Sequence, residues 1–136
     1  MADKTKRVDY FTVEIPNQPG ETFRVLAKLK EGGVNFLSIT GFPTAPGKGQ
    51  MSLLPENADT FVKAAKSAGL TTGPAKKALF VQGGDRVGAA AEVFKKLSDA
   101  KINVAAFNAS AAQGSFGLVL WFAAKDVDAA AKVLGA

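Results

Sequence analysis

The segment VEIPNQPG at residues 13–20 recurs in altered form as VQGGDRVG at residues 81–88, at an offset of 68 residues and without a gap. The identical pairs at this offset include Val13/Val81, Gly20/Gly88, Val25/Val93, Lys28/Lys96, Leu29/Leu97, Asn35/Asn103 and Gly49/Gly117. About four matches are expected by chance, so the agreement of apolar, glycine and asparagine positions carries more weight than the identities. Each copy takes half of the 136 residues, and the repeat predicts two similar units.

Each copy has the pattern strand, helix, strand, strand, helix. The expected strands are 8–15, 34–42 and 50–54 in the first copy and 78–82, 102–110 and 115–123 in the second, and the expected helices are 21–31, 55–69, 87–100 and 127–134. The residues 70–76 can add a last strand to the first copy, although Gly73-Pro74 weakens it. The second copy has no such segment, because the sequence ends at Ala136.

This order predicts an α+β fold of two ferredoxin-like βαββαβ units, 1–76 and 77–136, each an antiparallel sheet with helices on one face. The second unit lacks its last strand. The repeat aligns residues 3–8 with 71–76, so residues 3–8 are one candidate for the vacant edge beside the strand 78–82. An edge left open would invite pairing with another chain.

The amino-acid composition excludes several classes of function. The chain contains no Cys and no His, which removes disulfides, thiol nucleophiles, imidazole ligands and the commonest general base. Asp126 and Asp128 point apart on a helix, so no paired carboxylates are expected. We therefore expect no enzyme, no catalytic residue, no metal and no cofactor. The net charge of +5 is compatible with a polyanion or with a mildly basic surface.

Targeting signals are not evident. No apolar run approaches the length of a membrane span, and the charged N-terminus is not followed by a segment of signal-peptide type. We expect a cytoplasmic protein.

Two short motifs point to a known family. The loop Asn17-Gln18-Pro19-Gly20 before the first helix and Gly33-Val34-Asn35 after it resemble the ACT domain, a regulatory module that binds small molecules. The second copy departs from that pattern, since Val87 stands where Pro is usual and Lys101 where Gly is usual. The resemblance covers nearly the whole chain, which is similar to the stand-alone tandem ACT proteins.

The loops suggest how a ligand would bind. A loop that enters a helix presents free backbone N–H groups, which favour a carboxylate. The resemblance implies a ligand between neighbouring units, with 17–20 facing the Asn103 region and 85–88 facing the Asn35 region. The candidate site residues are Asn17, Gln18, Pro19, Gly20, Val34, Asn35, Asp85, Arg86, Val87, Gly88, Ile102 and Asn103. The departures at Val87 and Lys101 favour the first loop. Alternatively, these residues only shape turns and caps.

An RNA recognition motif is the main competing interpretation. Residues 79–83 and 114–121 resemble its first-strand and third-strand signatures, and Phe80 and Phe116 would then be exposed stacking platforms. Gly114 replaces the basic residue and Leu118 the second aromatic, and the first copy has neither signature. A ligand-free structural or assembly protein is the third alternative.

The preferred hypothesis is a small-molecule-binding regulatory or sensor protein whose ligand is an amino acid. Binding would shift the packing of one unit against another. We expect a homodimer, with a regulated enzyme or another protein as a possible partner, and neither nucleic acid nor membrane.

Overall fold

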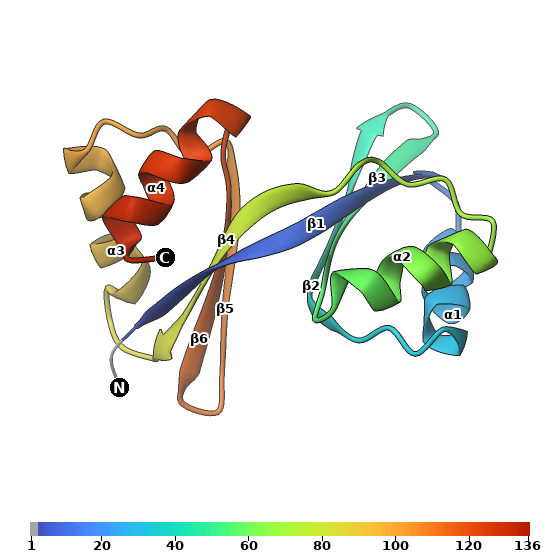
Figure 1. Ribbon diagram of the computed structural model, residues 1–136, viewed down its shortest axis with the longest axis horizontal. Helices are drawn as coiled ribbons and strands as arrows, with labels where there is room; N and C mark the ends of the chain where they lie inside the picture. Colours follow the sequence, from blue (N-terminus) through green and yellow to red (C-terminus); the bar gives the residue numbers. More distant parts are fainter. Residues whose placement is uncertain (1–2) are drawn as a thin grey trace. The chain divides into compact units, whose positions relative to one another are not determined.

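Strand β1 (Lys4–Pro16) belongs to both units of the fold. The computed structural model describes residues 3–136, which divide into one unit of residues 9–76 and a second that combines residues 3–8 with residues 77–136 (Figure 1). The long first strand therefore begins in one unit and ends in the other. The expected α+β class with antiparallel strands and helices is confirmed.

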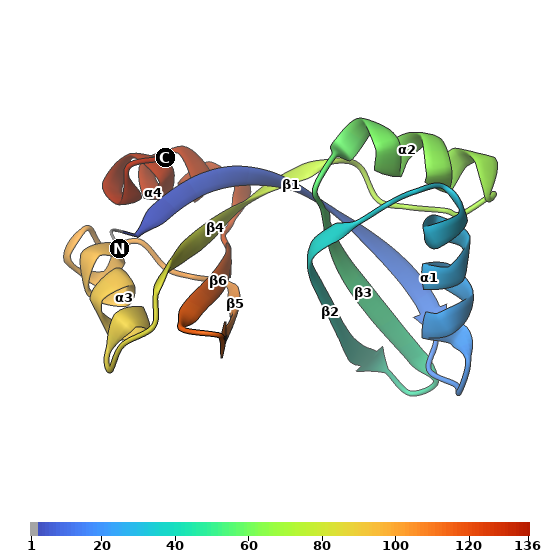
Figure 2. The same cartoon turned by 90° about the horizontal axis from the view of Figure 1, so that it is seen from below.

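The unit of residues 9–76 is a sheet covered on one face by two helices. Its remaining elements are α1 (Glu21–Glu31), β2 (Phe36–Ala45), β3 (Lys48–Pro55) and α2 (Ala58–Ser67). Strand β3 pairs antiparallel with both β1 and β2, and Figure 2 shows α1 and α2 on the same side of these strands. The rings of Phe11 and Phe61 stack with centroids 4.4 Å apart in the core between sheet and helices.

The unit that contains residues 77–136 repeats this arrangement. Its elements are β4 (Lys76–Gly84), α3 (Ala89–Asp99), β5 (Ala106–Ala112), β6 (Ser115–Trp121), a short 3₁₀ helix η1 (Ala124–Asp126) and α4 (Val127–Leu134). Strand β6 pairs antiparallel with β4 and with β5. The buried side chains of the core are Leu79, Val81, Ala89, Val93, Leu97, Phe116, Leu118, Leu120, Phe122, Val127, Ala130 and Ala131.

The N-terminal end of β1 fills the edge that the second copy leaves vacant. Strand β1 is hydrogen-bonded to β4 in the strand order, and residues 3–8 group with this unit. Arg7 Nη1 lies 2.6 Å from Asp128 Oδ1 on α4, and Lys6 Nζ lies 5.9 Å from the ring centre of Phe80. The candidate role of residues 3–8 is thus confirmed, whereas the expected unit 1–76 was wrong for these residues. Their side chains gave no local sign of this pairing.

The last strand expected at residues 70–76 does not form before Lys76. One backbone hydrogen bond remains, from Gly73 N to Thr12 O at 2.9 Å. Pro74 has no N–H to donate, and a Cβ on Gly73 would lie 2.7 Å from Thr12 Oγ1. The segment therefore runs beside β1 without becoming a regular strand.

The repeat contains a gap that the sequence comparison missed. Val13 pairs with Met51, and the equivalent Val81 pairs with Leu118, an offset of 67 and not 68 residues. The second copy is one residue shorter at the turn between its second and third strands. The match expected at Gly49/Gly117 is therefore wrong by one position, because the register of a sheet is set by pairing and not by identity.

Helices α1 and α3 end in the same way. The chain reverses through residues with positive φ, Gly33 at 76° and Lys101 at 58°, and the next N–H returns to the helix, from Val34 to Leu29 O and from Ile102 to Leu97 O. This is the Schellman arrangement. Val34 and Ile102 close the preceding helices, and β2 and β5 begin at Phe36 and Ala106, later than expected.

Lys101→Gly should raise the free energy of unfolding by about 0.5–1 kcal/mol. A left-handed conformation costs a residue other than glycine about 1–2 kcal/mol, and the greater freedom of unfolded glycine offsets part of this gain.

Gly33→Ala should lower stability by about 1 kcal/mol, although no atom lies within 4 Å of the new Cβ. Urea denaturation followed by circular dichroism measures both. Lys101→Ala, which keeps the strain, is the control and should change little; a loss of stability in Lys101→Gly would contradict the prediction.

Candidate functional site

The two loop–helix junctions share one backbone conformation. Gly20 has a φ of 89° and Gly88 a φ of 82°, and each precedes the first residue of its helix. The carbonyl of Gly20 accepts from Arg24 N at 2.9 Å, and that of Gly88 accepts from Glu92 N at 3.0 Å. The left-handed conformation explains why glycine stands at both positions.

Neither junction carries a side-chain cap. The N-cap residues Gly20 and Gly88 make no side-chain hydrogen bond to the first turn of α1 or α3, whereas the Asn57 side chain accepts from Thr60 N at 3.0 Å at the start of α2. Without a cap, first-turn N–H groups remain available to an external acceptor. The backbone of each loop is anchored, with Asn17 N donating to Gly47 O at 3.0 Å and Asp85 N to Gly114 O at 2.9 Å, and the first N–H of each helix donates to a loop carbonyl at 3.3 Å, Glu21 N to Gln18 O and Ala89 N to Arg86 O.

A hollow of about 330 Å³ lies at the second junction. Its lining residues are Asp85, Arg86, Gly88, Ala89, Ala90, Ala91, Ala109, Ser110, Ala111 and Phe116. The lining joins the loop, the first turn of α3 and strand β5, all within one unit. It contains three of the four loop residues that the sequence analysis proposed; the fourth, Val87, is fully exposed.

The hollow beside the first junction does not include the loop residues. It is lined by Glu14, Ile15, Pro16, Gly47 and Lys48 and by none of residues 17–20. The preference for the first loop is therefore not supported. Ala91 stands where α1 has Phe23, a side chain that is 75% exposed. The run of alanines at 89–91 was the sequence signal for the hollow, and the sequence analysis did not use it.

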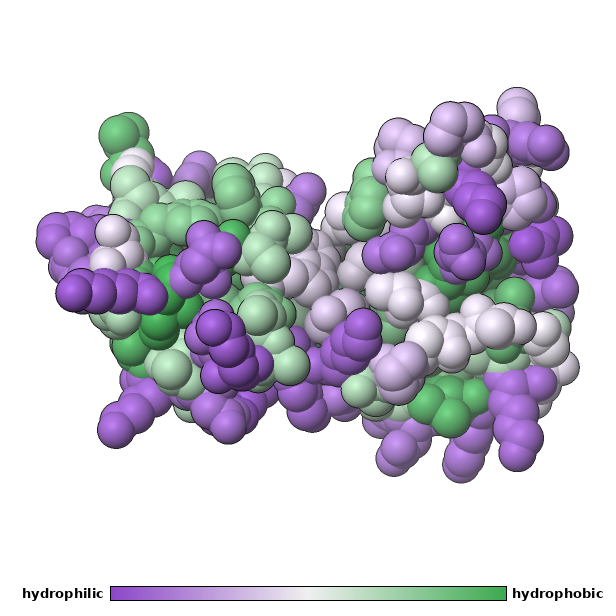
Figure 3. Space-filling view, turned by 90° about the horizontal axis from the view of Figure 1, so that it is seen from above, coloured by the Kyte–Doolittle hydropathy of each residue, from purple (hydrophilic) through white to green (hydrophobic). Residues whose placement is uncertain are grey.

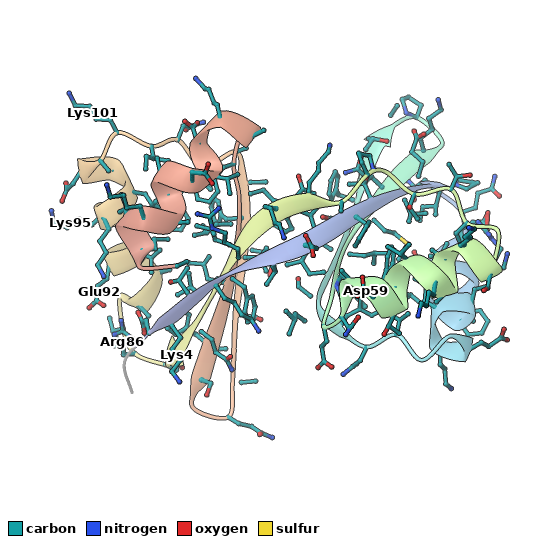
Figure 4. The ribbon with its side chains drawn as sticks, in the orientation of Figure 1. Lys4, Asp59, Arg86, Glu92, Lys95 and Lys101 are labelled. Atoms are coloured by element: carbon teal, nitrogen blue, oxygen red, sulfur yellow. The ribbon has the colours of Figure 1, made fainter. Side chains whose placement is uncertain are left out.

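Arg86 is the only charged side chain besides Asp85 that lines the hollow at the second junction. Its guanidinium forms a two-pronged ion pair with Asp3, with Nη1–Oδ1 at 3.1 Å and Nη2–Oδ2 at 3.0 Å. It also donates to Gly84 O at 3.0 Å and to the Glu92 carboxylate, and it lies over the Phe116 ring at 5.7 Å. Figure 4 shows Arg86 and Glu92 together at the start of α3.

These contacts shift the pKa values of both Asp3 and Arg86. The hydrogen bond from Arg86 lowers the pKa of the Asp3 carboxyl below its ordinary value of 3.8. Asp3, followed by Glu92, raises the pKa of the Arg86 guanidinium. The ion pair is therefore fully charged at neutral pH.

The proposed asparagines lie away from their own loops. Asn35 and Asn103 follow the C-terminal ends of α1 and α3, and 11-residue helices separate them from the loops by about 16 Å. Asn35 Nδ2 donates to Glu56 Oε1 at 3.0 Å, and Asn35 O accepts from Glu56 N at 3.0 Å. These bonds fit the alternative role of Asn35 in shaping a turn.

Val34 and Ile102 also differ from the loop residues. Their partly buried side chains pack against the cores of their units, and their N–H groups close the preceding helices. Within a single unit, the structure thus brings Asp85, Arg86 and Gly88 together but not Ile102 and Asn103.

The structure does not place Phe80 and Phe116 on one exposed face, as the competing RNA recognition motif interpretation requires. Phe116 is 6% exposed and lies in the helix-facing core. The register pairs Phe116 with Gly83, so Phe80 projects from the opposite face of the sheet. On the face drawn in Figure 3, the most hydrophilic side chains are scattered and form no single stripe. Two phenylalanines on opposite faces cannot stack successive bases together.

Among residues 3–136, no group of three or more acidic side chains is arranged to hold a metal ion. No helix among these residues has the length and apolar character needed to cross a membrane.

Comparisons with known proteins identify the fold. No protein-family model matches the sequence, and no curated protein is significantly similar to it. The structure of BT0572 from Bacteroides thetaiotaomicron superposes with a TM-score of 0.82 at 16% identity, over 96% of this chain and 88% of that one. The regulatory subunits of aspartate kinase from Thermus thermophilus, in its ligand-free form, and from Thermus flavus give TM-scores of 0.67 and 0.65, at 16% and 19% identity, over 98% of this chain and 94% of each. The chain shares the fold of these regulatory subunits of aspartate kinase.

Asp3→Asn should lower the melting temperature near neutral pH, because the ion pair with Arg86 stabilises the fold while Asp3 is charged. The folded pKa of Asp3 is depressed, so this contribution is present above 3.8 and is lost as the pH falls through the folded value. Thermal unfolding of both proteins across the acidic range measures the difference. A difference that persists in strong acid would contradict this account.

Proposed function

We propose that the protein is a non-catalytic regulatory protein that binds an amino acid in the hollow at the start of α3. The main observation behind this proposal is the lining of the hollow. It combines the uncapped N-terminus of α3, the charged loop residues Asp85 and Arg86, and several alanines. The shared fold with regulatory subunits of aspartate kinase supports a regulatory role. The ligand class follows from the chemistry of the lining.

The two ends of an amino acid match different parts of the hollow. First-turn N–H groups of α3, at Ala90 and Ala91, favour the carboxylate because they lie at the positive end of the helix dipole. The Asp85 carboxylate provides a partner for the ammonium group. A zwitterion thus finds opposite charges within one small site.

The volume of the hollow limits the size of the ligand that it can hold. Its volume of about 330 Å³ lies at the lower end of the range for small-molecule sites. Ala109, Ala111 and Phe116 supply the apolar part of the lining. These features favour an amino acid with a compact or apolar side chain over a nucleotide.

A neighbouring unit belongs to this proposal as well. By resemblance to the ACT family, each loop faces the asparagine of a neighbouring unit, so Asn17–Gly20 and Asn103 form one site and Asp85–Gly88 and Asn35 the other. Ligand bound in this way would favour one arrangement of units over another. The proposed state is a homodimer, and the proposed output is a change in a partner protein, such as a regulated enzyme.

A thermal-shift panel of the standard L-amino acids tests the proposal. An amino acid that binds the folded state should raise the melting temperature increasingly with concentration, by about 2.7 kcal/mol of stability at a hundred times its Kd. Ala109→Leu fills the hollow from an exposed strand position and should abolish the shift. Ala129→Leu, on the exposed face of α4, is the matched control and should retain it. A panel that leaves the melting temperature unchanged would sink the proposal.

A further inference from the structure

Two carboxylates hold Arg86: Glu92 lies on the helix that follows the loop, whereas Asp3 comes from the N-terminal segment. Asp3 immediately precedes β1, and 83 residues separate it from Arg86 in sequence. The same guanidinium lines the hollow in which we place the amino-acid carboxylate. A ligand carboxylate at the N–H groups of Ala90 and Ala91 therefore lies in the same hollow as Arg86, whose guanidinium already binds Asp3 and Glu92.

We propose that Asp3 is a built-in competitor of the ligand: a bound amino-acid carboxylate takes Arg86 from Asp3 and thereby loosens the N-terminal strand from its unit. This inference rests on the proposed function. Arg86 binds Asp3 through two parallel N–H donors, the geometry that a ligand carboxylate also prefers. A guanidinium cannot present the same pair of donors to both carboxylates at once.

The surroundings of Asp3 are adapted to its presence. A Cβ on Gly83 would overlap the Asp3 carboxylate and come within 2.9 Å of the Phe116 ring. Glycine at this position therefore makes room for the ion pair, and the first copy has Ile15 there instead. The positions equivalent to Arg86 and Asp3 in the first copy are Gln18 and Thr71, which carry no charge. The competition is thus a property of the second junction alone.

Release of Asp3 from Arg86 would affect the strand segment that follows Asp3. Residues 4–8 continue directly from Asp3 and form the part of β1 that belongs to this unit, and the same strand then enters the unit of residues 9–76. The Arg7–Asp128 ion pair remains as a second attachment of these residues. Ligand binding at the hollow would therefore reach the other unit through a single continuous strand.

Isothermal titration with the standard L-amino acids compares the wild type, Asp3→Asn and Asp128→Asn. For an amino acid that binds, Asp3→Asn should tighten the Kd about three- to fivefold, the amount expected from removing one partly exposed ionic competitor. Asp128→Asn removes the other attachment of the same strand without contacting Arg86, and the Kd should stay within about twofold of wild type. The amide of the same amino acid lacks the carboxylate and should gain nothing from Asp3→Asn.

The outcomes separate this inference from the proposed function. Binding that is unchanged or weakened in Asp3→Asn, or tightened equally in Asp128→Asn, would overturn the competition and leave the amino-acid site standing. No binding to any of the three proteins would overturn both.

Hydrogen exchange provides the reciprocal measurement. Because coupling between two equilibria is mutual, saturation of the wild type with the same amino acid should accelerate amide exchange in Lys4–Val8. Slower exchange in this segment would overturn the inference, because the ligand would then reinforce the pairing of the strand.

Discussion

The hydrogen-bonded pairing of the N-terminal strand with β4 is the constraint on which the second unit depends. Strand β4 lies between β6 and β1 in the strand order, so β1 covers the edge of β4 that β6 does not. Without residues 4–8, the N–H and C=O groups along that edge of β4 would lack protein partners and would attract another chain. Strand β1 is long because it satisfies this edge before it enters its own unit.

The same pairing shapes the candidate site. It brings Asp3 to the loop before α3, where the carboxylate binds Arg86. The second junction therefore combines an uncapped helix N-terminus with a guanidinium that is already engaged. The first junction has the same backbone but no such ion pair, and Phe23 occupies the place of an alanine. Two loops of equal geometry thus have different chemistry, which is how a duplicated unit can specialise.

Regulation by competition fits the energetics of exposed ion pairs. The side chains of Arg86 and Asp3 are 36% and 24% exposed, so their attraction is moderated by solvent and a ligand carboxylate can displace it. A deeply buried pair would resist displacement, because one charge would be left without a partner in a medium of low polarity.

The sequence by itself determined the local elements and their repetition. Helices α1 and α4 were predicted to the residue, because apolar spacing and glycine stops act within one turn. The glycines at 20 and 88 also predicted the loop conformation. Only the tertiary structure decided which unit contains residues 3–8, the one-residue gap in the repeat, and the meeting of Asp3 with Arg86. These features depend on strand pairing across long stretches of chain, and no local pattern encodes which edge a distant strand will join.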